Sequence, residues 1–179
     1  PIEEKHNIPI ILWRLDAERM VGRNSFGQTV SLEPFMGVMG MPLDQHGIQS
    51  TSPPRLTGGN IDCKELVAGS TLFLPIDIKG GLFSVGDGHA KQGDGETGGT
   101  AIESRMELVD LTFDVIDKPI ISTPYANTPK GWVTFGFDED LQIAHDNALR
   151  AMQKFIMKFY RVDKIIALGL MGVVVDFHI

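Results

Sequence analysis

The chain has 179 residues, a formal net charge of −7 and 42% hydrophobic residues, with 20 glycines and 10 prolines. This composition is typical of a globular, β-rich domain with many turns and a buried core, and it excludes a disordered segment. The acidic charge disfavours nucleic acid as a partner, because phosphate binding needs clustered Lys and Arg, and the single cysteine excludes an intrachain disulfide framework.

The ends of the chain and its longest apolar run bear on location and on partners. The run 165–175 falls well short of the roughly 20 residues that span a bilayer, and the first residues lack the basic and apolar segments of a secretory signal. We therefore expect a cytoplasmic protein with no membrane partner. The chain opens on Pro1 and closes on what reads as a severed strand ending at Ile179. We expect residues 1–179 to form one domain that is an incomplete part of a longer chain, and a second copy or the missing part to cover that edge.

Strands are predicted throughout the first two thirds of the chain. Runs of β-branched and aromatic residues alternate there with Gly- and Pro-rich turns. The most regular alternation of apolar and polar residues lies at 102–115, and a short helical turn is expected at 62–66. The predicted strands cover residues 8–15, 28–32, 35–39, 71–78, 81–85, 102–115, 120–124 and 132–137.

Two helices are predicted near the end of the chain. Asp138 is a suitable N-cap for the first, in which apolar residues recur at helical spacing from Leu141 to Phe159. Asp163 is expected to cap a second helix through about Met171, followed by a last strand. The sequence therefore predicts an α+β fold, rich in largely antiparallel sheets in a sandwich-like arrangement, with a late helix pair packed on one side.

The run 85–104 combines glycines with acid, base and metal-ligand groups. Asp87 and His89 are two residues apart, so in an extended segment both side chains project to one face, about 6.6 Å apart at the backbone, and can converge on one ion. Asp94 is predicted as a further metal ligand. Zinc accepts nitrogen and oxygen ligands and is the first candidate, while an oxygen-rich calcium loop is the alternative.

One carboxylate of this run is expected to act as general base on a metal-bound water. Glu96 is the first candidate and Glu103 the second, and Gln92 adds an amide to the predicted catalytic group. A purely structural turn or cation is the competing interpretation. A second loop places Arg55, Asn60 and Asp62 close together in the sequence, and these residues are predicted to bind substrate or to brace a rigid connector.

The chain resembles the acetamidase/formamidase family of amide hydrolases. The resemblance rests on the segments 34–40, 53–55 and 58–62, and above all on 86–96 with 99–103. It implies hydrolysis of short linear amides such as formamide or acetamide to ammonia and a carboxylate, with a divalent metal at the site. The alternatives are a relative that hydrolyses lactams, and a non-catalytic or scaffold module with a structural cation in the glycine-rich run.

Overall fold

The computed structural model describes residues 11–179. The chain divides into two compact units, Pro1–Glu33 and Pro34–Ile179, and each is described here by itself. The sequence prediction of a single domain stays a prediction. The first part of the predicted strand 8–15 lies outside the described residues, and its remainder corresponds to β1 (Trp13–Asp16).

The first unit is a three-stranded antiparallel sheet in the order β1-β2-β3. β2 (Val21–Asn24) pairs with β1 on one side and with β3 (Thr29–Ser31) on the other. Asn24 closes the second turn, because its side-chain oxygen accepts hydrogen bonds from the backbone N–H groups of Phe26 and Gln28. Such a local bond supports a tight turn and fixes the register of the strands that it joins.

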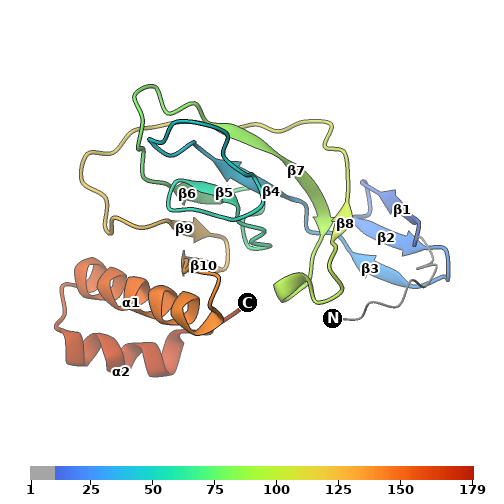
Figure 1. Cartoon of the computed structure of the whole chain (residues 1–179). Helices are drawn as coiled ribbons and strands as arrows, with labels where there is room; N and C mark the ends of the chain where they lie inside the picture. Colours follow the sequence, from blue (N-terminus) through green and yellow to red (C-terminus); the bar gives the residue numbers. More distant parts are fainter. Residues whose placement is uncertain (1–10) are drawn as a thin grey trace. The chain divides into compact units, whose positions relative to one another are not determined.

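The second unit contains two antiparallel sheets. The first has the order β5-β4-β7-β8 and the second has the order β10-β9-β6 (Figure 1). The strands of the first sheet are β4 (Phe35–Gly40), β5 (Gly58–Asn60), β7 (Ser84–Lys91) and β8 (Ile102–Glu103). A short 3-10 turn, Asp94–Glu96, lies between β7 and β8. The strands of the second are β6 (Thr71–Phe73), β9 (Tyr125–Thr128) and β10 (Gly131–Thr134).

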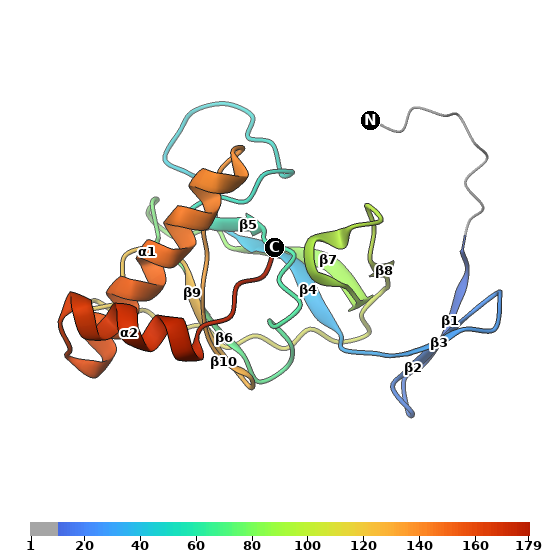
Figure 2. The same cartoon turned by 90° about the horizontal axis from the view of Figure 1, so that it is seen from below.

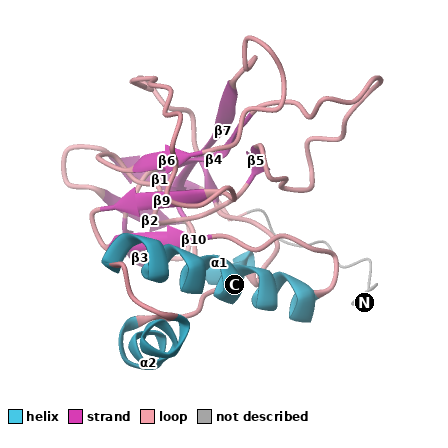
Figure 3. Ribbon diagram, turned by 90° about the vertical axis from the view of Figure 1, so that its left-hand side faces the viewer, coloured by secondary structure: helices cyan, strands magenta, loops and turns pink. Residues whose placement is uncertain are grey.

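Two helices complete the second unit, α1 (Leu141–Tyr160) and α2 (Lys164–Val174). The N-cap of α1 is Asp140 and not Asp138 as predicted, since the Asp140 carboxylate accepts from the N–H groups of Gln142 and Ile143. Asp163 caps α2 as predicted. Figure 3 shows α1 lying between β10 and α2, so the helix pair covers one side of the second sheet.

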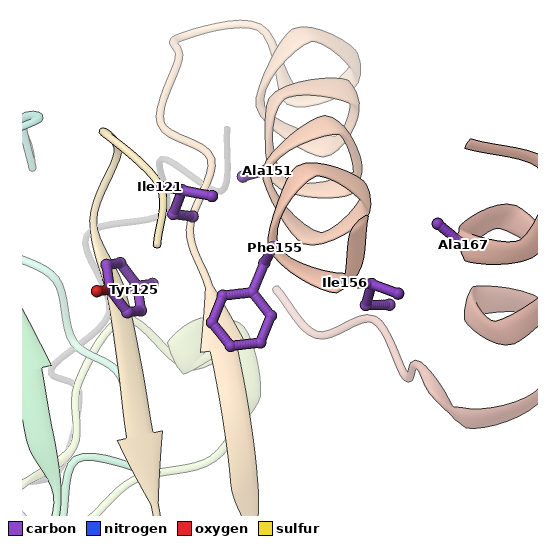
Figure 4. Close-up of a cluster of buried hydrophobic side chains, with 6 residues drawn as sticks. All are labelled: Ile121, Tyr125, Ala151, Phe155, Ile156 and Ala167. Atoms are coloured by element: carbon purple, nitrogen blue, oxygen red, sulfur yellow. The ribbon is translucent and has the colours of Figure 1, made fainter. Parts of the chain in front are cut away.

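Adjacent residues of β9 serve two different hydrophobic cores. Tyr125 packs with Phe155 of α1 in the core shown in Figure 4, whereas Ala126 joins Met39 of β4 in the other core. Successive side chains of a strand point to opposite faces, so the second sheet binds the helices on one face and the first sheet on the other. This layered arrangement confirms the predicted α+β class with antiparallel sheets and a late helix pair.

Several predicted strands are wrong in extent. Only Ile102–Glu103 of the predicted strand 102–115 pairs, and Leu108 and Phe113 beyond it are 82% and 67% exposed. Alternation alone does not make a strand where the described chain offers no neighbour to pair with. Residues 120–124 form no strand, and residues 81–83 form an irregular segment between the turn at 79–80 and β7. The predicted helical turn at 62–66 is a single turn closed by the Leu66 N–H and the Cys63 carbonyl. Residues 175–179 follow α2 without strand structure.

The aromatic contact between α1 and the second sheet should dominate the stability of this unit. Phe155 is 2% exposed, and the centroids of the Phe155 and Trp132 rings are 4.8 Å apart. We expect Phe155→Ala to lower the free energy of unfolding by about 3–5 kcal/mol. Phe159→Ala, one turn further along the helix at a ring that is 43% exposed, should cost less than half as much. Urea unfolding followed by circular dichroism measures both, and equal losses would contradict this account of the core.

Candidate functional site

Antiparallel pairing of β4 with β7 brings the predicted site together. Phe35 pairs with His89 and Val38 pairs with Gly86. β8 pairs with the other edge of β7, so that Glu103 lies opposite His89, and the register of this pairing shifts between His89 and Lys91. Asp62 comes from the segment after β5, where its backbone N–H donates to the Gly37 carbonyl at 3.1 Å.

His89 lies at the centre of the site and is 1% exposed. Its Nδ1 is 2.8 Å from the side-chain oxygen of Gln92. Its Nε2 lies 3.3 Å from Asp87 Oδ1 and 3.3 Å from Glu103 Oε2, but it forms no hydrogen bond with any described residue. The Phe35 ring packs edge-on at 5.2 Å between centroids and restrains the imidazole plane. A buried nitrogen without a hydrogen-bond partner is unusual, and the two carboxylates that face it favour a positive charge there, either a proton on the imidazole or a bound cation.

The carboxylates around His89 change one another's acidity. Burial alone would lower the pKa of the His89 imidazole, but the Gln92 hydrogen bond and the carboxylates of Glu103, Asp87 and Asp62 together raise this pKa above its ordinary value. Burial raises the pKa of Asp62, and repulsion from Glu96 adds to the effect. Burial and the neighbouring Asp87 likewise raise the pKa of Glu103. So many acidic groups in a small volume favour the binding of a positive charge.

Two overlapping groups of side chains in the described chain could hold a metal ion. Their ligand atoms lie within 4.8 Å of one another in each group, and both groups contain His89. The sequence predicted Asp87 and His89 as ligands, and Glu96 and Glu103 as catalytic carboxylates. The structure brings these four residues together and adds Asp62, which was expected to bind substrate. The groups are Asp62, Asp87 and His89, and His89, Glu96 and Glu103.

Gly37 leaves the space in which these side chains meet. A Cβ atom at this position would overlap Asp62 Oδ1, approach Asp87 Oδ2 at 3.0 Å and approach His89 Cε1 at 3.1 Å. Sequence reasoning did not single out Gly37. The available signal was a lone glycine inside an apolar strand pattern, which often marks a close approach.

Three residues of the site adopt backbone conformations that are uncommon for residues with a side chain. Asp62, Asp87 and Glu96 have φ values of 48°, 60° and 39°. Left-handed backbone at non-glycine residues costs roughly 1–3 kcal/mol each and concentrates at functional sites. The strain at Asp87 also explains why the carboxylate of a strand residue can turn toward His89.

The other predicted site residues lie in different surroundings. Asp94 belongs to neither group, because its carboxylate pairs with Lys64 at 2.7 Å and with His178 at 3.1 Å. The hydrogen bond from Lys64 lowers the pKa of Asp94 below its ordinary value. Figure 2 shows the segment after α2 returning toward this turn, where Ile179 lies against Gly95. The Lys64 and His178 contacts were not predicted, since nothing in the sequence links them to position 94.

Arg55 and Asn60 brace their own loop. The Arg55 guanidinium donates to the Pro53 carbonyl and the Asn60 amide donates to the Ser52 carbonyl. These bonds suit the rigid connector that the sequence left open as an alternative, and a role in substrate binding stays a prediction.

Cys63 lies next to the site and is not suited to nucleophilic catalysis. Its side chain packs at the edge of the core that contains Met39 and Leu66. Burial raises the pKa of this thiol to about 12. A thiol with so high a pKa stays protonated near neutral pH, and the protonated form is a poor nucleophile.

The fold agrees with what comparisons with known proteins show. The chain matches the model of the Acetamidase/Formamidase family over residues 28–164. This range is well over half of the chain, so the chain belongs to that family.

Among the described residues, we find no helix with the length and apolar character needed to cross a bilayer.

The relatives are amidases by name. An acetamidase of Mycolicibacterium smegmatis is 39% identical over 66 residues, which are 37% of this chain and 16% of that protein. A formamidase of Methylophilus methylotrophus is 52% identical over 46 residues, which are 26% and 11% of the two chains. The crystal structure of an acetamidase from Yersinia enterocolitica matches with a TM-score of 0.75 and 26% identity, covering 90% of this chain and 48% of the other. The chain thus spans about half the length of that solved relative.

The close approach of the site side chains to Gly37 can be tested with a single methyl group. We expect Gly37→Ala to weaken Zn²⁺ binding at least tenfold, because the methyl group displaces the Asp62 and Asp87 carboxylates. Gly86→Ala is the matched control, since Gly86 lies in the same strand pair and no atom outside its immediate chain neighbours would lie within 4 Å of the new Cβ. Isothermal titration calorimetry measures both affinities. Equal affinities of the two variants would show that Gly37 does not shape the site.

Proposed function

We propose that this protein hydrolyses the C–N bond of short linear amides, such as formamide and acetamide, to ammonia and a carboxylate. The observation that carries the proposal is the buried Nε2 of His89, which has no hydrogen-bond partner in the described chain and faces the carboxylates of Asp87 and Glu103. The names of the curated relatives support the class of substrate.

The distances around His89 suit a divalent metal ion. Ligands at about 2.0–2.1 Å from a tetrahedral zinc ion are separated from one another by about 3.3 Å. His89 Nε2 lies 3.3 Å from both Asp87 Oδ1 and Glu103 Oε2. We propose His89, Asp87 and Glu103 as the ligands, with one carboxylate taken from each of the two groups that share His89. This set differs from the sequence prediction by replacing Asp94 with Glu103. The imidazole nitrogen favours zinc over calcium, because calcium prefers oxygen ligands.

The side chains around these ligands have separate roles in the proposed reaction. A bound zinc ion lowers the pKa of a coordinated water toward neutrality. Glu96 removes the proton as the water oxygen bonds to the amide carbon, and returns it to the nitrogen as the C–N bond breaks. Asp62 Oδ1 is buried and has no hydrogen-bond partner among the described residues, so it is available to accept from the amide NH₂ of the substrate.

Two other readings make different demands on the same residues. A structural cation would need the ligands but no general base, so Glu96 would have no role in turnover. A lactam-hydrolysing relative would use the same groups on a cyclic amide. This alternative has less support, because the curated relatives are named for linear amides.

Location and assembly remain part of the proposal. We propose a cytoplasmic protein that associates with a second copy or with another part of the family chain. The predicted edge strand at the end of the chain is absent from the described structure, so that argument no longer applies. Support now comes from α2, where Ile165 and Val173 are 81% and 83% exposed.

Glu96→Gln separates catalysis from structure. We expect ammonia release from formamide and acetamide to fall about 10²–10⁴-fold, because the amide cannot accept a proton. Zn²⁺ affinity should change little, and the melting temperature should not fall, because the change removes one of several adjacent negative charges. Glu107→Gln is the matched control, at a carboxylate that is 90% exposed. If the zinc-loaded wild-type protein releases no ammonia, or if Glu96→Gln retains full turnover, the proposed mechanism is wrong.

Asp87→Asn tests the role of a ligand against that of charge repulsion. Asn tolerates the left-handed backbone at this position, so the change removes a charge without adding strain. Removing one of several adjacent negative charges should stabilise the metal-free protein by about 1 kcal/mol, whereas stabilisation by added Zn²⁺ should largely disappear. Thermal melting with and without Zn²⁺ measures both effects, with Asp117→Asn as the control at an exposed position. Undiminished stabilisation by Zn²⁺ in Asp87→Asn would remove Asp87 from the ligand set.

A further inference from the structure

The side-chain amide of Gln92 connects two segments of the site, because it donates one hydrogen bond and accepts another. Its side-chain nitrogen donates to the backbone carbonyl of Asp62 at 2.6 Å, and its side-chain oxygen lies 2.8 Å from Nδ1 of His89. Gln92 is 6% exposed and His89 is 1% exposed, so water does not compete for these bonds. The two contacts join positions that are 30 residues apart, counted from Asp62 to Gln92.

The carbonyl of Asp62 determines which way the Gln92 amide points. A backbone carbonyl can only accept a hydrogen bond, so the NH₂ group of Gln92 must face it. The oxygen of Gln92 therefore faces His89, and because this oxygen can only accept, Nδ1 of His89 must carry a proton. In a neutral imidazole one nitrogen is protonated and the other has the lone pair. The lone pair then belongs to Nε2, on the side of Asp87 and Glu103.

We infer that Gln92 is a positioning residue that fixes the tautomer of His89 and directs its Nε2 lone pair toward Asp87 and Glu103. This role differs from the direct catalytic role predicted from the sequence, because Gln92 acts through His89 and is not among the ligand groups. The tautomer of His89 does not depend on the proposed function, whereas the expected effect of Gln92 on metal affinity rests on it. Groups that hold the second nitrogen of a metal-binding histidine typically contribute 10–100-fold to metal affinity.

A purely structural role makes a different demand on Gln92. In that case the residue would serve only to satisfy the buried carbonyl of Asp62, and the acceptor facing His89 would not matter. Gln92→Glu and Gln92→Met separate the two roles. Both variants remove the donor to Asp62, but only Gln92→Glu keeps an acceptor of similar size for the Nδ1 proton.

The first measurement needs no variant and no metal. Long-range ¹H–¹⁵N correlation spectra of the wild-type protein, with His89 assigned by the loss of its signals in His89→Asn, report which nitrogen is protonated when the ring is neutral. We expect the Nδ1-protonated tautomer. A predominantly Nε2-protonated ring in the wild-type protein would overturn the inference, whether or not the protein binds zinc.

The second measurement compares the variants by Zn²⁺ titration and by the same spectra. Gln92→Glu should keep the Nδ1-protonated tautomer and bind Zn²⁺ within about threefold of wild type, whereas Gln92→Met should show Nε2 protonation and bind 10–100-fold more weakly. Equal losses in both variants, or none in Gln92→Met, would overturn the inference. Absence of Zn²⁺ binding by the wild-type protein would instead contradict the proposed metal-dependent function, and the tautomer would still decide the role of Gln92.

Discussion

The pairing of β4 with β7 is the interaction on which the site depends. It places the His89 ring against Phe35 and sets the Gly37 backbone beside the carboxylates of Asp62 and Asp87. The register matters as much as the pairing, because a shift by one residue would send His89 to the opposite face of the sheet. β4 also packs against the second sheet, since Met39 of β4 and Ala126 of β9 belong to one hydrophobic core. The helix layer thus stabilises the site from a distance, through the second sheet.

Crowding of the acidic side chains within the site disfavours their ionised forms. Four acidic side chains lie around one buried imidazole, and the pKa values of Asp62 and Glu103 are raised by burial and by neighbouring negative charges. Three of the acidic residues also have strained backbone. Clustered carboxylates and left-handed backbone at non-glycine residues both lower the free energy of unfolding. Such a local loss of stability is typical of sites selected for chemistry rather than for folding.

From the sequence, the glycine-rich run could be predicted to carry the candidate site, but the complete geometry of the site could not. The prediction that Asp87 and His89 converge assumes an extended segment, whereas Asp87 reaches His89 from left-handed backbone with a φ of 60°. Glu96 and Glu103 lie in the same glycine-rich run. Asp62 and Gly37 could not be placed, since only tertiary pairing brings them to His89. Asp94 carries the same i, i+2 signal with Glu96 as Asp87 with His89, yet the 3-10 turn at 94–96 directs its carboxylate to Lys64 and His178. Local spacing cannot distinguish these outcomes, because they depend on residues distant in the chain.

The same reasoning explains why the strand at 102–115 was overpredicted while the helices were found. A helix satisfies its backbone hydrogen bonds within its own segment, so the caps Asp140 and Asp163 and the apolar stripe largely determine it. A strand needs a neighbour. β8 ends at Glu103, where Ser104 still donates to the Gly88 carbonyl and Met106 then packs across Gly88. Because Gly88 has no side chain, the segment after β8 can cross it instead of continuing to pair with β7. This crossing ends β8 and also keeps Glu103 beside the imidazole of His89.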